Sequence, residues 1–175
     1  MQQLPDATNR KIALLIGERA ERETLLDFTA VLALRGPVRI LDASNSFDPY
    51  HVSRAIRRQT AQLHQVLARV SVARAFTCYQ VITLLQETPS MPMPHLVFDL
   101  LATFYDQAVS HAESYRLLQI AAGHLLRLGR QAPVIVSVRP TPQGGQPRLL
   151  QFLQRAADLV LLQEAQPVST LETLF

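Results

Sequence analysis

The chain of 175 residues contains no tryptophan, one cysteine (Cys78) and one lysine (Lys11). A single cysteine excludes an intrachain disulfide and a cysteine-based zinc cluster. No apolar run approaches the ~20 residues that a membrane-spanning helix requires, and residues 1–10 lack the apolar stretch of a signal peptide. We therefore expect a soluble, cytoplasmic protein that has no membrane partner.

Charge is also scarce, and arginine carries almost all of the positive charge. Charged residues make up 18% of the chain, and the formal net charge is +3 at pH 7. This mild excess permits nucleic acid or another acidic partner without requiring one. A GC-rich genome produces the same arginine usage, so composition by itself assigns no partner. Hydrophobic residues, at 48%, suffice for the core of one domain.

Short apolar segments alternate with segments of helical spacing. The expected strands are 11–16, 38–43, 71–76, 95–101, 134–138 and 158–162, and the expected helices are 21–34, 52–70, 79–86, 115–128 and 148–157. The strand segments are apolar throughout, which is typical of parallel strands buried on both faces. The sequence predicts an α/β fold: a three-layer, mainly parallel sheet with helices on both faces. Residues 11–163 would form this core domain, between tails at 1–10 and 164–175.

In sheets of this kind, ligands bind at the carboxyl ends of the strands. The first strand is followed by Gly17 and, seven residues later, by Thr24. These two residues fit the first and last positions of the phosphate-binding motif G-x-x-x-x-G-K-[ST]. Arg22 stands at the second glycine of that motif, and Glu23 stands at the lysine. The motif is therefore present only in degenerate form.

Further segments extend this partial match. Leu-Asp-Ala-Ser-Asn-Ser-Phe-Asp-Pro-Tyr at 41–50 follows the second strand, and Val-Ala-Arg-Ala-Phe at 72–76 precedes Gln80. His-Leu-Val-Phe-Asp at 95–99 is similar to a Walker B strand, and 134–138 is similar to the strand after it. In this order, over residues 11–163, the segments resemble the core of RecA-type recombinases. The resemblance implies a RecA-like P-loop fold with a degenerate Walker A motif.

The resemblance also implies that the residues that hold phosphate have been replaced. The family's P-loop lysine, which holds the β- and γ-phosphates, matches Glu23, and the glycine that lets the backbone close over them matches Arg22. An acid a few ångströms from a phosphate costs on the order of 4 kcal/mol per charge pair at an effective dielectric constant of ~20. We therefore expect ATP and Mg²⁺ to bind weakly at most, and we expect no other cofactor.

The positions that the resemblance assigns to hydrolysis are altered too. The glutamate that activates the attacking water matches Ser44, and the γ-phosphate sensor at the end of the fifth strand matches Arg139. The family's Mg²⁺ ligands are retained as Thr24 and Asp99. Without a metal, Thr24 would satisfy local backbone groups and Asp99 would be a turn or capping residue. The resemblance thus implies a pseudo-ATPase with no catalytic residue.

Two functions fit a pseudo-ATPase of this size. The first is a non-catalytic recombinase paralogue, a binding module in DNA repair or recombination whose partner is a RecA-type recombinase or another repair factor. The second is a SulA-like regulator that binds a partner outside recombination through the same core. An active ATPase that binds ATP weakly ranks third. A homodimer is compatible with the sequence, whereas filaments are not expected, because residues 1–10 hold no polymerisation motif.

Two groups of arginines are candidate contacts for DNA or an acidic partner. Arg54, Arg57 and Arg58 lie within one and a half turns of the long predicted helix, and Arg139 and Arg148 bound the loop that matches the family's second DNA-binding loop. Arginine binds phosphate through two parallel N–H groups. The first group is also explained as a solvated helix face, and the loop has no aromatic residue for base stacking.

The remaining features favour structural roles. Cys78 lies near a predicted helix start, a position that lowers a thiol pKa, but no histidine base is in register, so we expect it to pack. The five histidines form no metal-binding pair. In the tail, Leu171, Leu174 and Phe175 would share one face of a helical turn, which either covers the domain's own edge or docks on a partner or a second copy.

Overall fold

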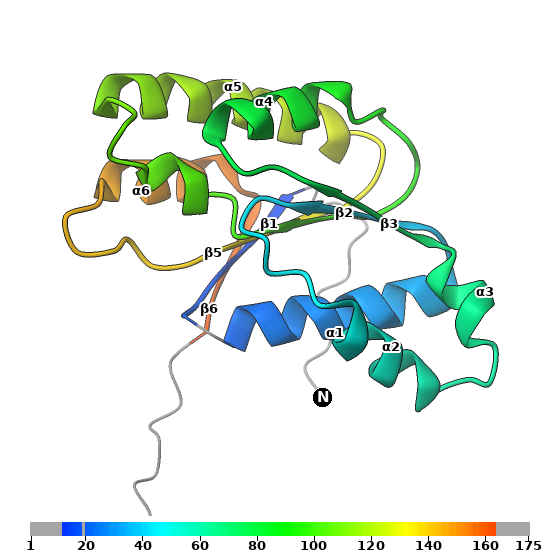
Figure 1. Cartoon of the computed structure of the whole chain (residues 1–175). Helices are drawn as coiled ribbons and strands as arrows, with labels where there is room; N and C mark the ends of the chain where they lie inside the picture. Colours follow the sequence, from blue (N-terminus) through cyan, green and yellow to red (C-terminus); the bar gives the residue numbers. More distant parts are fainter. Residues whose placement is uncertain (1–11, 19, 164–175) are drawn as a thin grey trace, which may run out of the picture.

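The computed structural model describes residues 12–18 and 20–163, so the predictions for the tails at 1–10 and 164–175 lie outside the described residues. Its elements are shown in Figure 1. The strands are β1 (Ile12–Ile16), β2 (Val38–Asp42), β3 (Val70–Arg74), β4 (His95–Phe98), β5 (Val134–Val138) and β6 (Leu159–Leu162). The helices are α1 (Ala20–Arg35), α2 (Pro49–Arg57), α3 (Leu63–Leu67), α4 (Cys78–Glu87), the 3-10 helix η1 (Ala102–Tyr105), α5 (His111–Gly129) and α6 (Pro147–Ala156).

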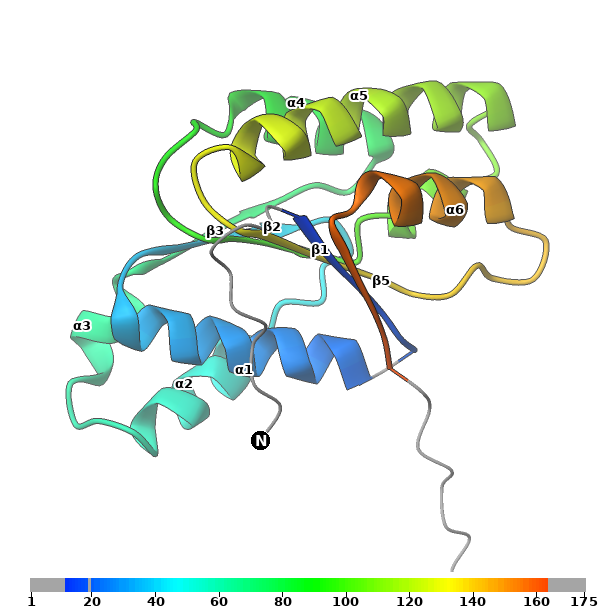
Figure 2. The same ribbon diagram turned by 180° about the vertical axis from the view of Figure 1, so that it is seen from behind.

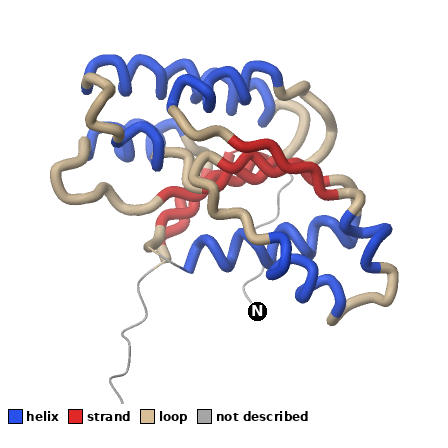
Figure 3. Tube along the Cα trace, in the orientation of Figure 1, coloured by secondary structure: helices blue, strands red, loops and turns tan. Residues whose placement is uncertain are grey.

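The six strands form one sheet in the order β3-β2-β4-β5-β1-β6, and every strand pairing is parallel. The register is continuous: Ile12 to Ile16 of β1, for example, pair one by one with Val134 to Val138 of β5. Figure 3 shows the sheet between two layers of helices. The predicted α/β fold, with a parallel sheet covered on both faces, is confirmed.

The direction in which the chain crosses the sheet decides which face each helix covers. From β1 the chain moves to β2 and then to β3 at one edge, and from β3 it returns through β4 and β5 to reach β6 at the other edge. Because crossovers between parallel strands are right-handed, reversing the direction transfers the connecting helices to the opposite face. Accordingly, α1, α2 and α3 lie on one face, and α4, α5 and α6 lie on the other (Figures 1 and 2).

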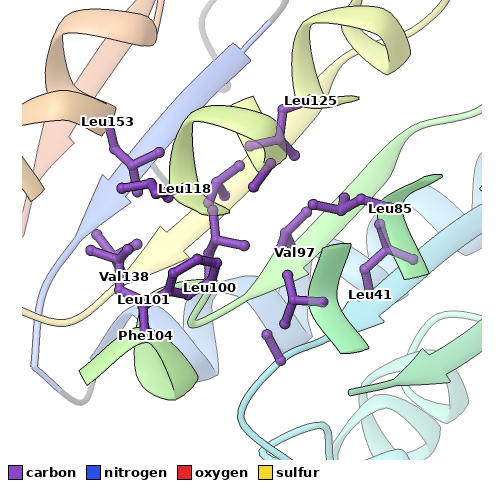
Figure 4. Close-up of a cluster of buried hydrophobic side chains, with 14 of the residues drawn as sticks. Leu41, Leu85, Val97, Leu100, Leu101, Phe104, Leu118, Leu125, Val138 and Leu153 are labelled. Atoms are coloured by element: carbon purple, nitrogen blue, oxygen red, sulfur yellow. The ribbon is translucent and has the colours of Figure 1, made fainter. Parts of the chain in front are cut away.

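Each face of the sheet buries its own apolar cluster. Beneath α4, α5 and α6, strand and helix side chains meet in the cluster drawn in Figure 4, which includes Leu41, Leu85, Val97, Leu118, Leu125, Val138 and Leu153. On the other face, Leu25 and Leu26 of α1 and Ile56 of α2 pack against Ile40 and Leu96. Strands that contribute to both clusters need apolar residues at successive positions, which explains why their sequences do not alternate.

The single helix expected over 52–70 is wrong, because the chain forms two short helices, α2 and α3, in this segment. No large apolar side chain occurs between Ile56 and Leu63. A helix gains most of its stability from packing an apolar face, so this polar stretch has nothing to hold it in helical form. Val70, which was expected to end the helix, begins β3 instead.

The strand expected over 95–101 is also too long. β4 ends at Phe98, because Asp99 has a left-handed backbone conformation (φ 43°) that an extended strand cannot continue. Leu100 and Leu101 are nevertheless fully buried, directly before η1. The other elements begin and end within a few residues of their predicted limits. In the described part of the chain, no helix is long and apolar enough to cross a membrane.

Candidate functional site

At the carboxyl end of the sheet, β1 and β5 are neighbours whose following helices lie on opposite faces, and so are β2 and β4. Ligands of α/β proteins bind where the helices diverge in this way. Gly17 follows β1 and Arg139 follows β5, so these residues lie at the ends of one such pair of strands. Asp99 follows β4, the strand between β2 and β5.

Asp99 and Arg139 form an ion pair at the ends of two neighbouring strands. The backbone N–H of Arg139 donates to Oδ1 of Asp99 at 3.3 Å, and its Nε–H donates to Oδ2 at 2.5 Å. The Asp99 side chain is only 14% exposed, against 59% for Arg139. The backbone N–H of Asp99 donates to the Ser137 hydroxyl at 2.9 Å, which fixes the turn that carries the acid. Arg139 therefore engages both carboxylate oxygens of Asp99.

Arg22, at the position of the motif's second glycine, joins the start of α1 to the loop between β2 and α2. Its Nε–H donates to the carbonyl of Ser46 at 2.7 Å, and its guanidinium lies 3.9 Å from the carboxylate of Asp48. The Arg22 side chain is 46% exposed, so solvent screens this ion pair. Glu23, the next residue, is exposed. The side chains of Arg22 and Glu23 thus lie on the surface, and Arg22 is bound to a neighbouring loop.

Thr24 lies in the second turn of α1 and therefore does not cap the helix. Its hydroxyl donates to the side-chain carbonyl of Gln163 at 3.5 Å. The backbone N–H of Gln163 in turn donates to the carbonyl of Ile16 at 2.8 Å. Thr24 thus connects α1 to the residue after β6, a contact between segments 139 residues apart that local sequence patterns do not reveal.

Asp42, the last residue of β2, is a buried acid that the sequence analysis did not single out. Its carboxylate accepts the backbone N–H groups of Ser44, Ser46 and Phe47 at 3.0 to 3.2 Å, and the Nε–H of Arg74 at 3.2 Å. These donors compensate for the loss of water around a fully buried charge. The sequence feature that could have revealed this residue is an acid at the end of an apolar strand, followed closely by two serines.

Ser44, which the sequence resemblance matches to a catalytic glutamate, forms hydrogen bonds within its own loop. Its hydroxyl lies 2.6 Å from that of Ser46 and 3.4 Å from Oδ1 of Asp42. Asn45, between the two serines, has a φ of 53°, a conformation that asparagine tolerates better than most residues. The Asp42 carboxylate therefore organises the loop that carries Ser44.

The arginines predicted to contact DNA or an acidic partner have different surroundings. Arg54, Arg57 and Arg58 are exposed along α2 and at its end, and no carboxylate of the described chain pairs with them. The Arg148 guanidinium instead lies over the ring of Tyr115, 3.8 Å from its centre. Arg139 is bound to Asp99, whereas the guanidinium groups of Arg54, Arg57 and Arg58 have no ion pair among the described residues.

A cavity of about 230 Å³ opens between the segment 104–111 and the loop at 144–146. Tyr105, Gln107 and His111 line it from the side of η1 and α5. Burial raises the pKa of the Tyr105 hydroxyl. The loop 139–148 has no aromatic residue of its own. An aromatic ring that lines the cavity beside this loop is that of Tyr105, from η1. Sequence spacing gave no sign of that contribution.

Cys78 is buried at the start of α4, and its predicted packing role is confirmed. Burial raises the pKa of its thiol and outweighs the backbone N–H groups at the helix start, which lower it. Desolvation decides the result, because a thiolate without water is strongly disfavoured.

No model of a known protein family matches this chain, and no curated protein sequence matches it. The structure itself defines an α/β domain with a six-stranded, wholly parallel sheet. A function for this chain is therefore inferred from the residues at the carboxyl ends of β1, β4 and β5.

Proposed function

We propose that this chain is a RecA-like core domain that has lost nucleotide turnover and acts as a binding module in DNA repair or recombination. Its partner would be a RecA-type recombinase or another repair factor. The observation that carries the proposal is the ion pair between Asp99 and Arg139. In this proposal, Arg139 binds the carboxylate of Asp99, which would otherwise hold Mg²⁺.

The order of the strands supports the RecA-like part of the proposal. β5 lies between β1 and β4, so the segments that resemble Walker A and Walker B border the same strand. On one side the Gly17 N–H donates to the carbonyl of Val138 at 3.3 Å, and on the other side Asp99 bonds to Ser137 and Arg139. A phosphate near Gly17 would therefore lie about two strand spacings, roughly 10 Å, from the end of β4.

The contacts of the charged residues support the loss of turnover. Mg²⁺ could bind Asp99 only by displacing Arg139, and phosphates could approach the start of α1 only beside Glu23. Arg22 would also have to leave the Ser46 carbonyl to let the backbone close over a phosphate. Each exposed contact is worth on the order of 1 kcal/mol or less, so the missing lysine contributes the largest part of the penalty.

Nucleotide binding by the purified full chain tests this proposal. We expect no saturable binding of a fluorescent ATP analogue with Mg²⁺ at millimolar concentration, and no ATPase activity above background with or without single-stranded DNA. The double variant Arg22→Gly/Glu23→Lys restores the motif and should gain measurable nucleotide binding. The control Arg22→Ala/Glu23→Ala removes the same side chains without adding a lysine and should gain less. Turnover by the wild type that Asp99→Ala abolishes would contradict the proposal.

A SulA-like regulator remains the second candidate, because the exposed guanidinium groups of α2 would suit any acidic partner. Salt-dependent binding of single-stranded DNA would favour the recombination module. Direct binding measurements with a purified RecA-type recombinase and with a purified cell-division protein then distinguish the two functions. Binding of the division protein alone would favour the regulator.

A further inference from the structure

A second cluster of cationic side chains lies at the amino-terminal end of the sheet, opposite the site described above. Arg39 of β2 and His95 of β4 are partners in the parallel register of these strands. Leu41 and Val97, two residues further along each strand, pack in the cluster beneath α4 and α5. Because side chains two residues apart share a face of a strand, Arg39 and His95 lie side by side on that same face.

His95 has an unsatisfied polar atom in this cluster. The residue is 1% exposed, and its Nδ1 is buried without a hydrogen-bond partner among the described residues. Burial lowers the pKa of His95, and the guanidinium groups of Arg39 and Arg127 lower it further. A buried polar group without a partner costs about 1 to 3 kcal/mol, so a group that accepts a hydrogen bond from this nitrogen would stabilise the site.

The two arginines contribute differently. The Arg127 guanidinium of α5 donates to the Ser90 hydroxyl and to the carbonyls of Leu85 and Thr88, so three of its five N–H donors are already used. Arg39 is partly exposed, and within residues 12–18 and 20–163 its guanidinium has neither a hydrogen bond nor an ion pair. No carboxylate of the described chain pairs with either arginine. The cluster therefore has positive charge, donors available on Arg39 and, once it is protonated, on His95, and no counter-ion among the described residues.

We propose that Arg39 and His95 form a binding site for a phosphate-type oxyanion, with Arg127 supplying further positive potential. A guanidinium donates two parallel N–H groups to such a group, and a protonated imidazole adds a third donor at Nδ1. The dianion would enter by way of the partly exposed Arg39, and His95 would take up one proton from solvent as it binds. This site is separate from the residues at the carboxyl end of the sheet and does not depend on the function proposed for them.

Sulfate is the probe of choice, because it has the geometry of phosphate and stays dianionic between pH 5.5 and 8. Binding to the full chain is measured by thermal denaturation at constant ionic strength, with chloride replaced by sulfate. We expect saturable stabilisation at pH 5.5 and roughly tenfold weaker binding at pH 8. Arg39→Gln should weaken binding at pH 5.5 by a similar factor. Arg130→Gln, which removes an exposed cation after α5, is the matched control and should change little.

A second measurement avoids any variant of the buried histidine. In the wild-type protein, the NMR titration of the His95 imidazole should move to higher pH in sulfate than in chloride. Equal stabilisation of the Arg39 and Arg130 variants, or an unchanged His95 titration, would mean an adventitious ion only and would overturn the proposal. Inorganic phosphate and phosphoserine then distinguish free phosphate from a phosphoryl group on a larger molecule, because the ligand that binds more tightly identifies the source. If neither ligand binds, the proposed site is overturned.

Discussion

Arg139 donates two hydrogen bonds to Asp99, one from its backbone N–H and one from its guanidinium, although forty residues separate the two. The contact joins the ends of β4 and β5, the two central strands of the sheet. Because one donor belongs to the backbone, Asp99 keeps a partner even when the Arg139 side chain is removed. The two residues should therefore respond unequally to substitution.

Arg139→Ala should lower the free energy of unfolding by only about 1 kcal/mol or less, because the guanidinium is more than half exposed and solvent screens it. Asp99→Ala should cost more, about 2 to 3 kcal/mol, because it removes the acceptor of a backbone N–H and replaces a residue with a left-handed backbone. Asp99→Asn keeps a hydrogen-bond acceptor, and asparagine tolerates a left-handed backbone. Its loss in the free energy of unfolding should therefore lie between those of Arg139→Ala and Asp99→Ala. Urea denaturation measures all three, and a larger loss from Arg139→Ala would contradict this account.

Asp42 should be the acid on which stability depends most. Asp42→Ala leaves Arg74 and three backbone N–H groups without their acceptor, so we expect a loss of about 3 to 5 kcal/mol in the free energy of unfolding. The control is Asp48→Ala, which removes the N-cap of α2 and should cost about 1 kcal/mol. Equal losses in urea denaturation would show that Asp42 does not organise its loop as its hydrogen bonds indicate.

The exposed arginines of α2 should decide whether DNA binds. If Arg54, Arg57 and Arg58 contact phosphates, replacing all three by glutamine should weaken binding of single-stranded DNA and reduce its salt dependence by up to about 0.7 per lost contact. The control replaces three dispersed exposed arginines, Arg35, Arg130 and Arg155, by glutamine. It makes the same change in net charge and should leave the salt dependence of DNA binding nearly unchanged. Fluorescence anisotropy at several salt concentrations measures both. Equal slopes in the two variants would assign the α2 arginines to a solvated surface.

Cys78 should be chemically protected in the folded protein. Burial raises the pKa of its thiol, so both access and the thiolate fraction are low near neutral pH. We expect its reaction with a disulfide reagent to be at least about a hundredfold slower than in urea, which corresponds to about 3 kcal/mol for local opening. Reaction of the native protein at the unfolded rate would contradict the burial of this residue.

The sequence predicted the sheet well, because each strand must be apolar on both faces wherever helices cover it. The same reasoning failed at 52–70, where helical spacing continued across a polar gap that the core does not reach. It also missed the end of β4, because the left-handed backbone of Asp99 depends on its bonds to Ser137 and Arg139, which come from a distant strand. Local patterns predict an element more reliably than the position where tertiary contacts end it.

The candidate site was predictable only in part. The rule that ligands bind at the carboxyl ends of strands places Gly17, Asp99 and Arg139 at one edge of the sheet. Their contacts depend on the order of the strands, which a single sequence does not specify. The roles of Asp42 and His95 were missed because their partners are distant in sequence. Asp42 binds Arg74 of β3, and His95 lies near Arg39 of β2 and Arg127 of α5.

Acid should destabilise the protein through the buried His95 and the partly buried His124. Burial, reinforced by Arg39 and Arg127, lowers the pKa of His95 below its ordinary value, and burial together with Arg127 lowers that of His124. In the unfolded chain both groups titrate near pH 6.5. Between the folded and unfolded pKa values, the unfolded chain binds more protons, so the free energy of unfolding rises with pH. This contribution is complete above about pH 6.5 and is lost as the pH falls toward the folded pKa values.

Urea denaturation between pH 5 and 8 in chloride buffers checks this expectation. Sulfate and phosphate must be absent, because an anion bound at His95 would favour its protonated form and reduce the slope. His95→Gln should remove most of the decline below pH 6.5, because His95 is almost fully buried and faces two guanidinium groups, whereas His124 is less buried and faces one. His124→Gln should therefore remove the smaller part. If the decline persists unchanged in the His95 variant, the buried imidazole is not its source, and the cationic cluster at the amino end of the sheet does not control stability.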